Sequence, residues 1–123
     1  MQRILMVLVV GLLSVGCLTP EQKQKRLRDS VVGEYERKRE NVDTLKRVLL
    51  ENGVSEWYLN SKKQGGEDKW SIVNGEIHLN SDDREINVFR INADKIITRI
   101  AVIRGGKRTD MPKEDQYTYK KIK

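Results

Sequence analysis

The sequence has few of the residues that build covalent, metal and catalytic sites. Its 123 residues include one cysteine, Cys17, and one histidine, His78. A lone cysteine cannot close an internal disulfide, so the fold must depend on its core and its backbone hydrogen bonds. A lone histidine without a cysteine cluster argues against a zinc site. No serine stands in a nucleophile-elbow motif, which argues against a Ser-His-Asp hydrolase. We therefore expect a non-catalytic protein with no metal and no cofactor.

The sequence also lacks an apolar run long enough to cross a bilayer at its N-terminus. The uncharged stretch over residues 4–16 has 13 residues, whereas a spanning helix needs about 20. Arg3 precedes this stretch and small residues end it, as in a cleaved secretory signal. We therefore expect residues 1–16 to be a signal-peptide helix that is removed, and not a transmembrane anchor.

The residues around the lone cysteine make this interpretation more specific. The run Leu13-Ser14-Val15-Gly16-Cys17 resembles the lipobox of bacterial lipoprotein signal peptides. The resemblance implies cleavage before Cys17, acyl chains on Cys17 and a stable anchor in an envelope membrane, because two or more chains hold a protein firmly. Leu18 stands where an Asp can retain such proteins at the inner membrane, which favours the periplasmic face of the outer membrane in a Gram-negative cell. The alternative is an ordinary secretory signal that contains a cysteine.

The charges of the chain are dense and mixed in sign. There are 24 Lys and Arg against 18 Asp and Glu, a net charge of +6. The acidic residues are interleaved with the basic ones, and an export signal leads away from nucleic acid, so we expect no nucleic-acid partner. An anionic lipid, an anionic envelope polymer or an envelope protein fits the excess positive charge better.

The chain after the leader divides into a polar segment and one small domain. Residues 17–30 contain mostly polar and charged side chains, and we expect them to be the lipidated cysteine and a charged tether. Residues 31–123 are the length of a single domain.

Short β-branched segments alternate with turn residues throughout this domain. Asn52-Gly53 and Asn74-Gly75 are typical of type I′ hairpin turns, and further turns are expected at 64–66, 81–83, 92–94 and 105–106. The segments between them predict strands over residues 45–51, 54–59, 69–73, 76–80, 85–91, 96–103 and 116–122. The predicted fold class is mainly β, an antiparallel meander of about 7–8 short strands in a small barrel or a half-open rolled sheet.

One segment also fits a helix. Val42, Leu45, Val48 and Leu49 have near-helical spacing, and Asn52-Gly53 could equally end a helix. The alternative is therefore an α+β fold with one helix within residues 34–51 packed on the sheet. A strand that enters the Asn52-Gly53 hairpin is the preferred prediction.

A second, shorter resemblance lies near the start of the domain, where a further strand is expected before residue 45. Gly33-Glu34-Tyr35 resembles the Gly-x-aromatic entry of lipocalin-like bacterial domains, which implies a small β-barrel and does not fix a function. Tyr35, Trp57 and Trp70 are then either core anchors or the lining of a ligand cavity at the barrel mouth. The leading hypothesis is a non-catalytic envelope binding or interaction module, and the alternative is a lipocalin-like carrier of a small apolar ligand.

Overall fold

The computed structural model describes residues 19–40, 42–82, 84–92 and 95–123. The expected signal peptide and Cys17 lie outside the described residues, so cleavage and lipidation stay predictions. Within the described ranges, no helix is both long and apolar enough to span a bilayer.

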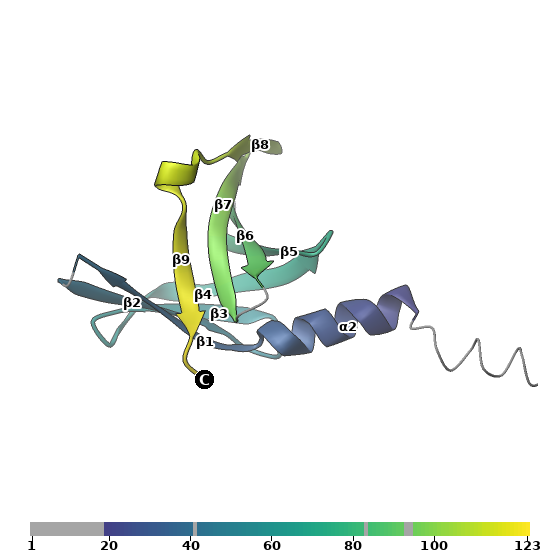
Figure 1. The fold of residues 1–123 in the computed structure, drawn as a ribbon, viewed down its shortest axis with the longest axis horizontal. Coiled ribbons are helices and arrows are strands. Elements are labelled where there is room, and N and C mark those ends of the chain that lie inside the picture. The colour runs from purple at the N-terminus through teal and green to yellow at the C-terminus, as the bar shows by residue number, and fades with distance from the viewer. Residues whose placement is uncertain (1–18, 41, 83, 93–94) are drawn as a thin grey trace, which may run out of the picture.

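The chain folds as an antiparallel β meander preceded by one helix, which confirms the predicted mainly β class (Figure 1). The elements after the helix are β1 (Gly33–Arg39), β2 (Asp43–Leu49), β3 (Val54–Leu59), β4 (Lys62–Val73), β5 (Glu76–Asp82), β6 (Glu85–Asn92), β7 (Ile96–Arg104), β8 (Lys107–Asp110), the 3₁₀ turn η1 (Lys113–Asp115) and β9 (Tyr117–Lys121).

Eight of the strands close into a barrel, the more closed of the two predicted arrangements. β1 to β7 follow one another around it, and β9 closes it by pairing with both β7 and β1. β7 is central, as its apolar residues on both faces predict. β6 pairs along one edge of β7, while β9 and β8 share the other edge, at residues 96–99 and 101–104 respectively. β8 is thus an extra strand outside the ring.

Residues 34–51 form two strands, so the alternative of a helix there is wrong. β1 and β2 pair in unbroken register, from Gly33 opposite Leu49 to Arg39 opposite Asp43. The near-helical spacing is overridden because β2 has partners on both edges, and its alternate residues Leu45 and Leu49 both pack against the core.

A helix stands where the sequence predicts a tether. α2 (Pro20–Val31) begins with a capping box, in which the Gln22 N–H donates to Thr19 Oγ1 at 3.1 Å and the Thr19 N–H donates to Gln22 Oε1 at 3.0 Å. Its last turn buries Val31 in the core, with Leu27 packed beside it. The charge-rich composition of this segment conceals a helix start and two apolar contacts with the domain that is predicted to begin at residue 31.

Polar contacts also fix α2 against one end of the barrel. Gln24 Nε2 donates to the Ile72 carbonyl at 3.2 Å, and Arg28 Nη2 donates to the Glu51 carbonyl at 3.1 Å. The Arg28 guanidinium carbon lies 4.7 Å from the centre of the Trp70 ring. The helix is therefore part of the folded unit and not a flexible spacer.

The turns agree with the sequence in place more than in type. Asn74-Gly75 has two positive φ angles, 51° and 78°, as type I′ requires. At the other Asn-Gly pair only Gly53 has a positive φ, 87°, and its N–H donates to the Leu50 carbonyl at 3.1 Å, so the turn centres on residues 51–52. The turn expected at 64–66 is wrong, because these residues lie inside β4 at a break in its register with β3.

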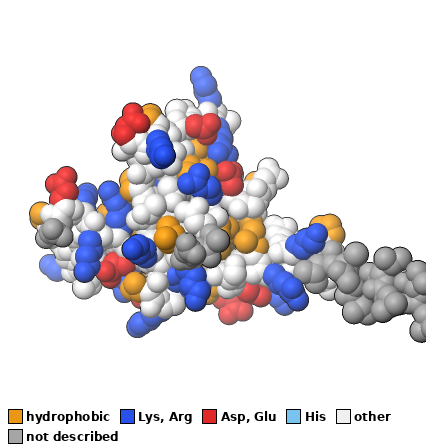
Figure 2. All heavy atoms as spheres, viewed as in Figure 1, with side chains coloured by type: hydrophobic (Ala, Val, Ile, Leu, Met, Phe, Trp, Pro, Cys, Tyr) orange, Lys and Arg blue, Asp and Glu red, His pale blue; other side chains and the backbone are white. Residues whose placement is uncertain are grey.

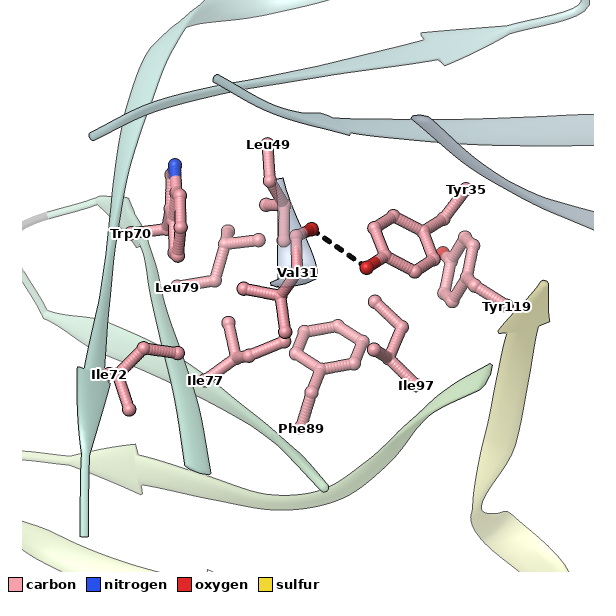
Figure 3. Packing of buried hydrophobic residues seen from close by; sticks show 10 residues of the cluster. All are labelled: Val31, Tyr35, Leu49, Trp70, Ile72, Ile77, Leu79, Phe89, Ile97 and Tyr119. Carbon is pink, nitrogen blue, oxygen red and sulfur yellow. Dashed lines mark hydrogen bonds between the residues drawn. The ribbon is translucent and has the colours of Figure 1, made fainter. Parts of the chain in front are cut away.

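The core lies inside the barrel at the end that α2 covers (Figure 3). Its buried members are Val31, Tyr35, Leu49, Trp70, Ile72, Ile77, Leu79, Phe89, Ile97 and Tyr119. Two polar atoms in it are satisfied by main-chain carbonyls: Tyr35 Oη donates to Val31 at 2.7 Å, and Trp70 Nε1 donates to Leu50 at 2.8 Å. The core thus joins the helix to the sheet through both apolar packing and hydrogen bonds.

Candidate anion-binding site

Three arginines continue the inward-facing rows of the barrel beyond the apolar core. Arg37 follows the buried Tyr35 by two residues on β1, and Arg99 follows the buried Ile97 by two residues on β7. Arg47 lies directly opposite Tyr35 in the β1–β2 register. Because side chains two apart on a strand, or directly opposite across a ladder, share a face, all three arginines lie on the core side of the sheet.

Two of these arginines contact the same tyrosine. The guanidinium carbons of Arg37 and Arg99 lie 4.0 Å and 5.3 Å from the centre of the Tyr117 ring, within cation–π range. Tyr117 in turn contacts Tyr119 edge to face, with 6.0 Å between ring centres, and Tyr119 contacts Phe89 at 6.1 Å. The aromatic chain therefore runs from the core out to the two cations.

The third arginine, Arg47, is largely buried and only partly satisfied. The Arg47 side chain is 13 % exposed, and its Nε and Nη1 atoms are buried without a hydrogen-bond partner. Nη1 lies 3.7 Å from Asp68 Oδ2, beyond hydrogen-bond distance, and the Trp57 ring lies 5.8 Å from its guanidinium carbon. Buried N–H groups without acceptors are uncommon and costly, so Arg47 has unused hydrogen-bonding capacity inside the barrel.

We call Arg37, Arg47, Arg99, Trp57, Tyr117 and Tyr119 the arginine–aromatic cluster. Burial raises the pKa of the Tyr119 hydroxyl, and the nearby Arg47 charge and hydrogen bond oppose that rise. The tyrosine therefore stays protonated at neutral pH and can donate a hydrogen bond, as arginine does.

The positive charge of this cluster is only partly neutralised. Asp68 accompanies Arg47, and Arg99 Nη2 lies 3.8 Å from Glu85 Oε1, while Arg99 Nε donates to Asn87 Oδ1 at 2.9 Å. Among the described residues, no ion pair involves Arg37. On the outer surface, by contrast, acidic side chains lie among the basic ones across the viewed face (Figure 2).

A groove of about 550 Å³ opens beside Arg37, where β1 and β9 diverge. These two strands pair only at Tyr35–Lys121 and Glu36–Lys120, and β9 then rises away from the β1–β2 hairpin (Figure 1). The lining residues of the β1–β9 groove are Glu36, Arg37, Lys38, Gln116, Tyr117, Thr118, Lys120 and Ile122. The groove gives a ligand lateral access to the Arg37–Tyr117 contact.

The structure does not bring the three sequence-predicted aromatics into one site. Tyr35 and Trp70 belong to the buried core, and both bond to main-chain carbonyls. Trp57 is half-buried on the inward face beside Arg47, outside the core cluster. Cys17, the predicted lipidation site, lies outside the described residues.

His78, the lone histidine, lies on β5 half-buried and near one acidic and one basic side chain. Burial lowers its pKa, the charge of Glu76 opposes this, and that of Arg108 adds to it. Arg108 is itself held by Glu76 through Nη1–Oε1 and Nη2–Oε2 distances of 2.8 Å and 3.2 Å. Within the part of the chain that the structure describes, no group of three His, Cys, Asp or Glu side chains is placed to hold a metal ion.

The cluster was missed from the sequence because a charged residue in a strand is usually assigned to the solvent face. The alternation of apolar and polar residues along the strands nevertheless indicates which way these arginines face. Arg47 stands between Leu45 and Leu49, and Arg99 stands two residues after Ile97. An arginine that takes the place of an apolar residue in the alternation of its own strand indicates that its side chain faces the interior.

No family model, no curated protein sequence and no solved structure matches this chain.

Proposed function

We propose that the protein is a non-catalytic binding module of the bacterial cell envelope, anchored through a lipid on Cys17, and that its arginine–aromatic cluster binds an anionic group of another envelope component. The observation that carries the proposal is Arg47, whose buried Nε and Nη1 nitrogens lack a hydrogen-bond acceptor. A carboxylate or phosphate would supply that acceptor, and charge-assisted bonds to arginine are the stronger kind.

Arg37 supports the same ligand chemistry at the solvent-facing end of the cluster. Its guanidinium contacts the Tyr117 ring, and Arg37 lines the β1–β9 groove. Its N–H groups can therefore bind a ligand without first breaking an ion pair with a carboxylate of the described residues. A ring that is already in contact with the guanidinium limits the freedom of both side chains. Less conformational entropy is then lost when the anion binds.

The carrier of a small apolar ligand is the less favoured function. That hypothesis places Tyr35, Trp57 and Trp70 around one cavity, but Tyr35 and Trp70 pack in the core with Leu49 and Leu79. The remaining tryptophan contacts a guanidinium. An anionic ligand therefore fits the surroundings of these aromatics better than an apolar one.

The anion site is tested with pyrophosphate added to the full chain purified in a neutral detergent. We expect saturable heat of binding and a change in tryptophan fluorescence, because Trp57 lies beside Arg47. Arg47→Gln and Arg37→Gln should each weaken binding by about tenfold or more. The matched control is Arg90→Gln, since Arg90 is exposed on β6 and its loss changes the net charge equally. Equal weakening by the control, or no binding at low salt, would refute the site.

The anchor is tested separately by the intact mass of the membrane-extracted protein. The wild type should begin at residue 17 and carry added acyl mass, and Cys17→Ser should lose both the mass and the membrane association. A chain cleaved elsewhere, or an unmodified cysteine, would contradict the lipoprotein assignment and leave the anion site unaffected.

A further inference from the structure

The β1–β9 groove has an unpaired strand edge on each side. No described strand pairs with the β9-facing edge of β1 at residues 37–39. On β9, residues 117–119 pair only with β7. The Glu34 N–H and carbonyl both bond across to the C-terminal residues 122–123. Since backbone groups alternate in direction along a strand, those of Lys38 point into the groove, as do those of Thr118 opposite.

We infer that the anionic ligand is an extended acidic segment of a partner protein, which enters the β1–β9 groove and pairs with one of these strand edges. The inference rests on the proposed function, because it names the class of ligand that the cluster binds. Addition of a strand to an exposed edge is a common mode of peptide recognition, in which main-chain bonds give affinity and side-chain contacts give specificity.

The charges of the groove select an acidic segment. Arg37, Lys38 and Lys120 line it with Glu36 as the one acidic side chain among its lining residues. Arg37 lies on the inward face, whereas Lys38 and Lys120 lie on the outward face of their strands. An added strand presents side chains to both faces in the same alternation, so its acidic residues can meet cations on either side.

The groove also offers apolar contact to a side chain between two acidic ones. Ile122 is 48 % exposed at its lower end, and the half-buried Tyr117 ring forms its wall. The free edge from Arg37 to Arg39 is about 10 Å long at the usual strand rise, which suits a segment of only a few residues. A lipid headgroup or a polyphosphate could meet the same cations, but neither carries the regular row of N–H and carbonyl groups that pairs with a strand edge, so the groove favours a peptide.

The experiment compares three probes on the full chain in neutral detergent. One is a short, end-blocked peptide of alternating Asp and Val, the second is the same peptide with alternate backbone nitrogens methylated, and the third is a vesicle rich in anionic lipid. We expect the first peptide to bind and to shift the backbone amide resonances of Lys38 and Thr118. The methylated peptide should bind at least about tenfold more weakly, because the edge that bears the methyl groups has no main-chain donors left for pairing.

A charge-reversed pair of variants locates the contact. Lys38→Glu with Lys120→Glu should weaken the acidic peptide by more than about tenfold. Lys62→Glu with Lys69→Glu is the matched control, because both lysines are exposed on β4 and the net charge changes equally. Circular dichroism of both pairs checks that the barrel is retained.

The outcomes separate this inference from the proposed function. Equal binding of the methylated peptide, or amide shifts away from the groove, would overturn strand addition. So would vesicle binding that depends on Lys38 and Lys120 while neither peptide binds. If pyrophosphate still binds in an Arg47-dependent way in these cases, the anion site stands and the peptide assignment fails. Loss of both would remove the proposed function as well.

Discussion

The hydroxyl of Tyr35 should be worth a measurable part of the stability of the whole protein. This hydroxyl lies on β1 and donates to the Val31 carbonyl of α2 at 2.7 Å inside the core, so one hydrogen bond links the strand to the helix there. Carbonyls in the last turn of a helix have no partner within the helix, so this carbonyl depends on the tyrosine. Tyr35→Phe removes the donor and leaves a buried acceptor unsatisfied. We expect a loss of about 1–2 kcal/mol in the free energy of unfolding.

The assay is thermal and urea unfolding followed by far-ultraviolet circular dichroism. A loss of that size should lower Tm by about 4–8 °C for each kcal/mol in a domain of this length. Tyr58→Phe is the matched control, since the Tyr58 hydroxyl donates to Glu56 Oε1 at 3.2 Å in a partly exposed place. Its loss should cost less than about 0.5 kcal/mol. Equal stability of Tyr35→Phe and the wild type would refute the role given to this bond.

Alkaline pH provides an independent check on the same side chain. Burial raises the pKa of Tyr35 to about 12, whereas an unfolded tyrosine titrates near 10. The folded state therefore keeps its proton longer, and this stabilisation is complete below pH 10 and is lost as pH rises from about 10 to about 12. Phenylalanine does not titrate, so the stability difference between wild type and Tyr35→Phe should narrow over this range. A constant difference would show that the hydroxyl is not buried.

Three further substitutions test the barrel and the helix by unfolding. Trp70→Phe should cost about 1–2 kcal/mol in the free energy of unfolding, because it removes the indole hydrogen bond of 2.8 Å to the Leu50 carbonyl, which keeps its Gly53 donor, and leaves space in the core; no loss would contradict that bond. Gly33→Ala should destabilise strongly, since Gly33 has φ +150° and its added Cβ would overlap the C-terminal carbonyl, while Gly66→Ala, with nothing within 4 Å, should be nearly neutral. Thr19→Ala should lower the helical circular dichroism signal and reduce the free energy of unfolding by about 1 kcal/mol, because the capping box is lost. An unchanged helical signal would argue against the cap.

The strands could be predicted from the sequence because their apolar residues alternate with polar ones over short distances. The segment 54–59 coincides with β3, and 96–103 differs from β7 by one residue. α2 could not be predicted in this way, since it has only Leu27 and Val31 to place against the core. Its capping signal at Thr19 is short and lies in a run of charges.

The turns and the candidate site depended on information that a local pattern does not hold. The tight turn between β3 and β4 has Asn60 and Ser61 at φ 50° and 71°. It contains no glycine, the residue that usually indicates positive φ angles in a sequence. The arginine–aromatic cluster draws Arg37 and Arg47 from the β1–β2 hairpin and Tyr117 from β9, which is distant from that hairpin in the chain. The closing pair β1–β9 brings the first and last strands together, and no segment of the sequence encodes that pairing by itself.

The outer edge of β8 is poorly suited to pairing with a strand of a second molecule. An open strand edge invites another molecule to continue the sheet, and such continuation leads to aggregates. The sheet ends on β8, four residues long, with all four side chains exposed and three of them charged. Arg108 also forms ion pairs with Glu76 and Asp110, so charged groups surround this short strand. Addition of another strand is therefore hindered at β8. The free edges of β1 and β9 face each other, so the space between them admits at most one short extended segment. If the proposed anchor on Cys17 concentrates many copies on one membrane, this arrangement would hinder neighbouring copies from joining edge to edge.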